Sequence, residues 1–130
     1  MPTSAALGQR PILVVGDSLS AEYGLARGTG WVALLEQRLV REHIDATVVN
    51  ASISGDTTSG GRARLPALLR QHRPTLVVIE LGANDALRGL PLEETRANLM
   101  AELQMNPTVC DSFFRGLESR LDVSIRRYLA

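Results

Sequence analysis

The sequence predicts an α/β fold in which about three parallel strands alternate with helices. Three short runs rich in β-branched residues, at 12–15, 46–50 and 75–81, each lead into a loop of glycine and small polar residues. Helical hydrophobic spacing follows each loop. Since such units connect through right-handed crossovers, we expect parallel strands with all three loops at one end of the sheet.

The composition limits the classes of function that fit the chain. Its 130 residues suit one domain, and its 14 basic and 14 acidic residues cancel, which gives no indication of a nucleic-acid partner. The single cysteine, Cys110, excludes an internal disulfide and a cysteine-rich metal site. No apolar run approaches the roughly 18 residues of a membrane span. We therefore predict no metal, no nucleic acid and no membrane span.

The first strand is predicted at residues 12–15, which are too few for a helix and apolar enough for burial on both faces. Gly16 ends the strand, and Ser18 follows just past its carboxyl end, where open α/β sheets bind ligands. Two interpretations of Ser18 stay open on this stretch alone. It is either a nucleophile or an ordinary turn residue that caps the next helix.

Residues 1–10 are predicted to be a flexible leader without the basic and apolar segments of a secretion signal, so the sequence as written predicts a cytoplasmic protein. A loop at residues 21–29 then leads to a helix over 30–42. Its inward stripe is expected to consist of Trp31, Leu34, Leu35 and Leu39. Trp31 suits either a substrate platform or core packing, and the spacing favours core packing.

The second strand is predicted at residues 46–50, followed by a small-residue loop at 51–58 and a flexible stretch at 59–61. Pro66 suits the first turn of a helix, and Leu65, Leu68 and Leu69 would form its apolar face. Pro74 is expected to end that helix region.

The third and strongest strand candidate covers residues 75–81, with a loop expected at 82–85. A helix is predicted over residues 92–103, with Pro91 at its start. Its inward side chains are expected to be Leu92, Leu99 and Leu103.

The composition shifts after Gln104, where Asn106 and Pro107 break the helix. We therefore separate a domain at residues 1–104 from a divergent tail at 105–130. The tail is predicted to form one amphipathic helix, because helical spacing connects Phe114, Leu117, Leu121, Ile125 and Tyr128.

A catalytic arrangement is possible where the three loops meet. A serine hydroxyl needs a base to take its proton and donors for the oxyanion that its attack creates. The backbone N–H groups of Ser18 and Gly55 and the side-chain amide of Asn84 would converge at one end of a parallel sheet. Asn84 also suits an ordinary turn in the sequence Gly-Ala-Asn-Asp.

Three blocks in order, at residues 16–20, 50–57 and 80–85, resemble the first three blocks of the GDSL, or SGNH, hydrolases. Residues 64–69 and 87–89 also resemble the bacterial arylesterase and multifunctional acyl-CoA thioesterase/lysophospholipase group, and the similarity covers about residues 11–103. It implies a flavodoxin-like three-layer α/β/α sandwich that hydrolyses small acyl esters or thioesters without a cofactor. It also implies Ser18 as nucleophile, Gly55 and Asn84 as oxyanion-hole donors, and a periplasmic location if an upstream signal exists.

The chain departs from this family at the last block, Asp-x-x-His, which is absent. Its two histidines, His43 and His72, lie in predicted helices, and neither follows an aspartate by three residues, so we expect neither to act as the base. The alternative is therefore a truncated or frame-shifted domain, catalytically impaired, that at most binds acyl ligands. Without the family's later strands, the strand at 75–81 would be an open edge, which predicts self-association.

Overall fold

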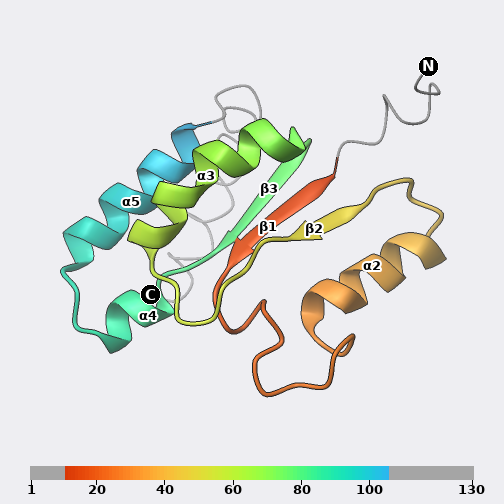
Figure 1. The fold of residues 1–130 in the computed structure, drawn as a ribbon, viewed down its shortest axis with the longest axis horizontal. Coiled ribbons are helices and arrows are strands. Elements are labelled where there is room, and N and C mark those ends of the chain that lie inside the picture. The colour runs from red at the N-terminus through yellow and green to blue at the C-terminus, as the bar shows by residue number, and fades with distance from the viewer. Residues whose placement is uncertain (1–10, 106–130) are drawn as a thin grey trace, which may run out of the picture.

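The computed structural model describes residues 11–105, so the predicted leader and tail helix lie outside the described residues. Its centre is a parallel sheet of β1 (Ile12–Gly16), β2 (Val48–Asn50) and β3 (Leu76–Glu80), in the order β2-β1-β3 (Figure 1). Ile12 is in register with Val48 on one side and Leu76 on the other. The predicted parallel arrangement of three strands is confirmed.

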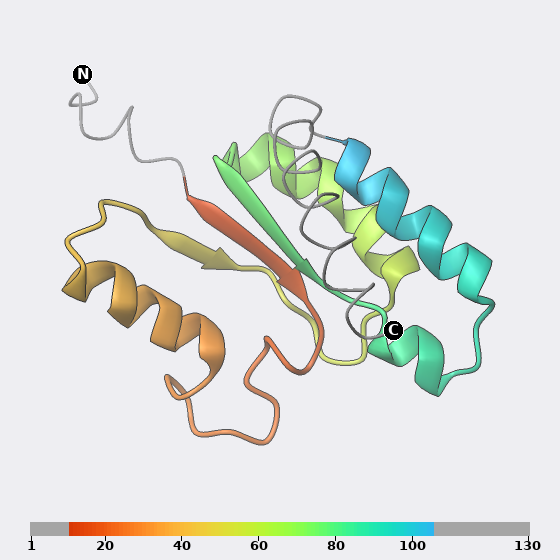
Figure 2. The same ribbon diagram turned by 180° about the vertical axis from the view of Figure 1, so that it is seen from behind.

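The helices lie on both faces of this sheet. Helix α2 (Trp31–Arg41) connects β1 to β2, α3 (Thr58–His72) connects β2 to β3, and α4 (Ala83–Leu87) and α5 (Leu92–Gln104) follow β3. Because β2 and β3 flank β1 on opposite sides, right-handed crossovers place α2 and α3 on opposite faces. Figures 1 and 2 show this, with α5 beside α3. The result is a three-layer α/β/α arrangement.

The core is built around β1, whose residues 13–16 are all buried. Leu13 and Val15 pack with Leu65 of α3 in one cluster. Val14 points to the other face, because successive strand residues alternate, and α2 buries Val32 and Leu39. The short apolar run after Pro11 is therefore the fully buried strand that the sequence predicted.

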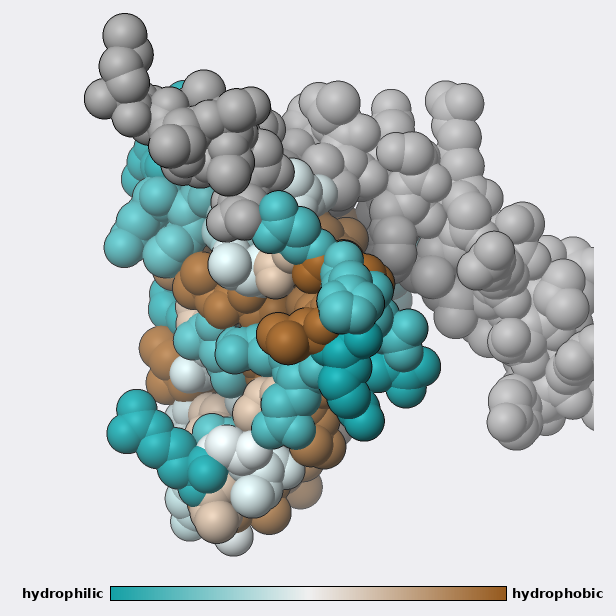
Figure 3. Space-filling view, turned by 90° about the vertical axis from the view of Figure 1, so that its right-hand side faces the viewer, coloured by the Kyte–Doolittle hydropathy of each residue, from teal (hydrophilic) through white to brown (hydrophobic). Residues whose placement is uncertain are grey.

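Helix α2 buries a narrower stripe than its sequence predicted. Leu39 is buried as expected, but Leu34 is 53% exposed and Trp31 37% exposed, and Val32 takes an inward position. The physical reason is that α2 packs near β2, a strand of only three residues, so one stripe of the helix is covered. Figure 3 shows that side of the molecule, where hydrophobic surface is interrupted by hydrophilic surface.

Helix α3 begins at Thr58, so the prediction of a flexible stretch at residues 59–61 is wrong. The side chain of Thr57 accepts a hydrogen bond from the Gly60 N–H and so caps the first turn. Gly61 lies so close to Leu81 and Glu102 that a Cβ atom there would collide with both side chains. A larger residue at this position would force these two side chains to shift, so the glycine serves close packing.

Pro66 lies inside α3, contrary to its predicted place in the first turn. The amino end of α3 is fixed by the N-cap Thr57, so the helix already contains about two turns when the chain reaches Pro66. Proline donates no N–H, so α3 has one intrahelical hydrogen bond fewer at this point. The helix ends at His72, before Pro74, as predicted.

The segment after β3 also differs in part from its prediction. Residues 83–87 form the short helix α4, where a loop was expected at 82–85. Pro91 precedes α5 as predicted, but Leu92 is 80% exposed because α5 starts beside α4, past the end of the sheet (Figure 1). Leu99 and Leu103 are half-buried, and the fully buried residue of α5 is Glu102.

Candidate active site

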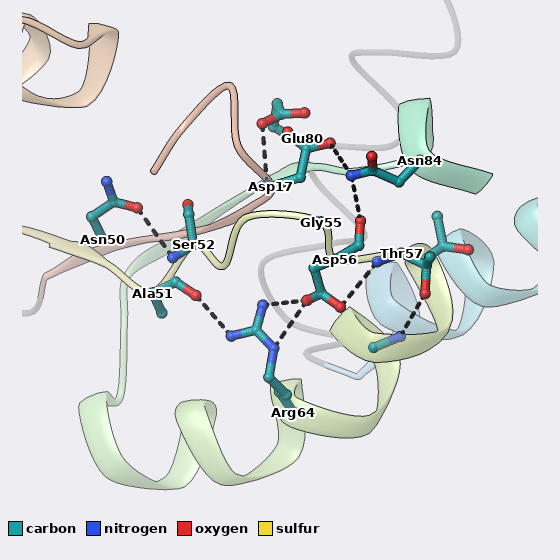
Figure 4. Close-up of polar contacts among 12 residues, drawn as sticks. Asp17, Asn50, Ala51, Ser52, Gly55, Asp56, Thr57, Arg64, Glu80 and Asn84 are labelled. Atoms are coloured by element: carbon teal, nitrogen blue, oxygen red, sulfur yellow. Dashed lines mark hydrogen bonds and ion pairs between the residues drawn. The ribbon is translucent and has the colours of Figure 1, made fainter. Parts of the chain in front are cut away.

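The loops that follow β1, β2 and β3 meet at the carboxyl end of the sheet (Figure 4). The Asn84 side-chain amide donates to the Asp56 carbonyl oxygen over 2.9 Å and lies 3.5 Å from Asp17 Oδ2. Asp17 immediately precedes Ser18, and Asp56 immediately follows Gly55. The structure thus brings the three loops named in the sequence analysis together around the Asn84 amide.

Ser18 lies half-buried in a turn that Asp17 organises. The Asp17 carbonyl accepts hydrogen bonds from the N–H groups of Ser20 (3.1 Å) and Ala21 (2.9 Å), and its Oδ1 accepts from the Leu19 N–H at 3.0 Å. The turn that contains Ser18 is therefore held by the hydrogen bonds that Asp17 accepts from the three residues after Ser18.

Gly55 has a φ of 82°, in the left-handed region that favours glycine. The loop around it is held by Arg64 of α3, whose guanidinium donates to Asp56 Oδ2 (2.6 Å from Nη2) and to the Ala51 carbonyl (2.7 Å from Nη1). One side chain thus fixes the loop on both sides of Gly55.

Asn84 is positioned by its neighbour Asp85, a buried carboxylate in α4. Asp85 accepts hydrogen bonds from the Thr58 N–H (2.9 Å), the Thr58 hydroxyl and the Thr95 hydroxyl (3.0 Å). Burial alone would raise the pKa of Asp85, but these hydrogen bonds stabilise its charged form and lower the pKa below 3.8. The network ties α4 to α3 and α5 and thereby sets the place of Asn84.

A second polar network, which the sequence did not predict, supports the Ser18 turn. Glu80 Oε1 accepts from the Ser20 hydroxyl (2.8 Å) and the Asp17 N–H (3.3 Å). The Trp31 indole N–H donates to Ser20 Oγ over 2.9 Å, so Trp31 braces the turn and is not the core residue that was expected. The sequence feature that indicates this network is Glu80 itself, an acidic residue at the end of the otherwise apolar strand β3. Burial raises the pKa of Glu80.

The two histidines lie far from Ser18. Helix α2 starts at Trp31, which contacts the Ser18 turn, and runs 11 residues away from it, about 16 Å, before His43. Helix α3 starts beside the Gly55 loop and runs 15 residues, about 22 Å, to His72 at its end. Both histidines are therefore at the amino end of the sheet, opposite the three loops.

Residues 11–105 contain no group of three or more His, Cys, Asp or Glu side chains arranged to hold a metal ion. Within the same range, none of the helices has the length and apolar character needed to cross a membrane.

Several known proteins are similar to this chain in sequence and architecture. Esterase TesA of Pseudomonas aeruginosa is 59% identical over 93 residues, 72% of this chain and 46% of that protein. Thioesterase 1/protease 1/lysophospholipase L1 of Escherichia coli K12 is 50% identical over 93 residues, 72% of this chain and 43% of that protein. The crystal structure of the psychrotrophic esterase EstA from Pseudoalteromonas, inhibited by monoethylphosphonate, matches with a TM-score of 0.72 and 47% identity, over 78% of this chain and 56% of that one.

The chain spans about half the length of the curated relatives that it matches. The sequence profile of one family, by contrast, matches residues 14–127, nearly the whole chain. The chain therefore belongs to the GDSL-like lipase/acylhydrolase family.

Proposed function

We propose that the chain acts on carboxylic esters or thioesters with Ser18 as the nucleophile and with the Gly55 N–H and the Asn84 amide as oxyanion donors. The observation that carries this proposal is the position of the Asn84 amide, within 2.9 Å of the Asp56 carbonyl and 3.5 Å of the Asp17 carboxylate. The ester or thioester substrate class rests on the names of the relatives, an esterase and a thioesterase.

The chemistry follows from these groups. The Ser18 hydroxyl oxygen attacks the acyl carbonyl carbon, and the negative charge that develops on the carbonyl oxygen is stabilised by N–H donors. The alcohol or thiol leaves with a proton, and water then hydrolyses the acyl-serine to release the acid. One Asn84 N–H bonds Asp56, while the contact to Asp17 is long, so a donor remains for the oxyanion.

A second candidate, a catalytically impaired domain that at most binds acyl ligands, is favoured by the positions of His43 and His72. Both lie at the far end of the sheet from Ser18, as the directions of α2 and α3 require. Without a base, donors and positioning alone leave a residual acceleration of about 10³–10⁴-fold over water in other serine hydrolases. We therefore expect very weak turnover of short-chain aryl esters.

The test is to treat the purified chain with a fluorophosphonate and to measure aryl-ester hydrolysis, with Ser18→Ala as control. Slow labelling of Ser18 with weak turnover, both lost in Ser18→Ala, is the expected result. No labelling of Ser18 after prolonged exposure would contradict its role as nucleophile. Rapid stoichiometric labelling with esterase-like turnover would contradict the impaired state and require a base outside the described residues.

The third strand suggests a further property. In the described residues β3 pairs with β1 alone, and it carries Leu76, Val77, Val78 and Ile79 on a half-buried strand. Apolar strands with an unpaired edge associate with other chains. We propose that the chain self-associates through β3.

A further inference from the structure

The segment that carries Ser18 is held by side chains from three other elements. Ser20 is at the centre: its hydroxyl donates to Glu80 of β3 and accepts from Trp31 of α2, and its carbonyl accepts from the Asn50 amide at the end of β2 over 2.7 Å. These contacts cross the sheet from both neighbours of β1. The geometry of the turn therefore depends on residues that are distant in sequence.

Glu80 is distinctive among these side chains because it contacts the turn on both sides of Ser18. Its Oε1 atom receives the Asp17 N–H just before Ser18 and the Ser20 hydroxyl two residues after it. The contact also requires Gly16: a Cβ atom there would lie 2.9 Å from Glu80 Oε1 and 2.6 Å from Ser20 Oγ. The absence of a side chain at Gly16, the end of β1, thus leaves the space that Glu80 Oε1 occupies.

We propose that Glu80 is a positioning residue for Ser18, and that its carboxylate fixes the backbone of residues 17–20 in the conformation that presents the Ser18 hydroxyl. A carboxylate accepts both donors more strongly than a neutral group does. The proposal rests on the proposed function for its meaning in catalysis. Its structural part, the restraint of residues 17–20, stands independently.

The experiment compares Glu80→Ala, Glu80→Gln and a stability control, Leu68→Ala, in the full chain. Leu68 packs against the core cluster from α3 and is not among the hydrogen-bond partners of the turn, so we expect its truncation to lower stability without altering the turn. The first readout is hydrogen exchange of the backbone amides of residues 17–20. The second is the second-order rate constant for labelling of Ser18 by a fluorophosphonate.

In Glu80→Ala the Asp17 amide loses its acceptor, and we expect it to exchange about tenfold faster or more. The Ser20 amide, which donates to the Asp17 carbonyl, should exchange faster as well because the Ser20 hydroxyl no longer holds the turn to Glu80. The labelling rate should fall by about the same factor. Glu80→Gln keeps an acceptor oxygen and should stay within about threefold of the parent chain. Leu68→Ala should leave exchange at residues 17–20 unchanged, since loops exchange by local opening.

The proposal would be overturned if residues 17–20 exchanged equally fast in Glu80→Ala and the parent chain. It would also be overturned if Leu68→Ala accelerated their exchange as much as Glu80→Ala does. If Glu80→Ala does not fold, Ser20→Ala removes one of the two donors, and unchanged exchange in that variant overturns the proposal equally. If Ser18 is unreactive in every variant, the proposed function fails, while the exchange measurement still decides the role of Glu80.

Discussion

Glu102 is expected to make the stability of the chain fall as the pH rises. It lies on α5 against Gly61 of α3, it is 3% exposed, and neither of its carboxylate oxygens has a hydrogen-bond partner in the described structure. A buried charge without a partner is strongly unfavourable, so the group keeps its proton in the folded state. We predict that Glu102→Met stabilises the chain at pH 8 and leaves it nearly unchanged at pH 4.

The magnitude follows from the pKa. Burial, assisted by the nearby charges of Asp56 and Asp85 and opposed by Arg62 and Arg64, raises the pKa of Glu102 from 4.5 to about 7. Below pH 4.5 both folded and unfolded chains bind the proton, and stability is at its full value. Between pH 4.5 and 7 only the folded chain keeps it, so stability falls by about 1.4 kcal/mol per pH unit, about 3 kcal/mol in all. Above pH 7 the loss is complete.

The assay is urea unfolding from pH 4 to pH 8, followed by circular dichroism. The free energy of unfolding of Glu102→Met should exceed that of the parent chain by an amount that grows by about 3 kcal/mol across this range. Glu36→Met, on the exposed surface of α2, is the matched control and should show no such growth. Because Glu80 is present in both chains, the difference isolates Glu102. A difference between Glu102→Met and the parent chain that does not change with pH would refute the reasoning.

Three further outcomes are expected. Gly61→Ala should destabilise the chain by about 1–3 kcal/mol in urea unfolding because its Cβ would collide with Leu81 and Glu102, and an unchanged midpoint would contradict this. Asp85→Ala should lower the free energy of unfolding by about 3 kcal/mol, because the buried Thr58 N–H loses its acceptor. Since the pKa of Asp85 is lowered in the folded chain, the stability that Asp85 contributes should be lost as the pH falls below 3.8. Size-exclusion chromatography with light scattering should show self-association, whereas a sharp, concentration-independent monomer would show that the β3 edge is covered.

The order of elements and the meeting of the three loops were predictable, because a strand buried on both faces leaves an uninterrupted apolar run and parallel strands end at one edge. The residues at which the helices begin and end were harder to predict. Thr57 caps α3 well before Pro66, which is the more conspicuous helix signal in the sequence. The burial of Glu102 could not be predicted, since nothing in its local sequence distinguishes it from an exposed glutamate.

The candidate site shows the same division. Ser18, Gly55 and Asn84 are predicted site residues that come from short local blocks, and backbone topology alone suffices to bring their loops together. The support from Glu80 to Ser20 joins residues 60 positions apart and depends on the direction of one side chain. Trp31 was assigned to the core from its helical spacing, which specifies a face of α2 but not the hydroxyl that the indole N–H reaches.

The central place of β1 has a consequence for biosynthesis. The strand is made first, yet residue 12 pairs with residue 48 on one side and residue 76 on the other. At about 5–20 residues per second, the ribosome takes roughly 3–13 s to supply that last partner. During this interval β1, the most apolar strand of the sheet, lacks its β3 partner. Nascent chains of this protein should therefore depend on chaperones until the segment around residue 76 has been translated.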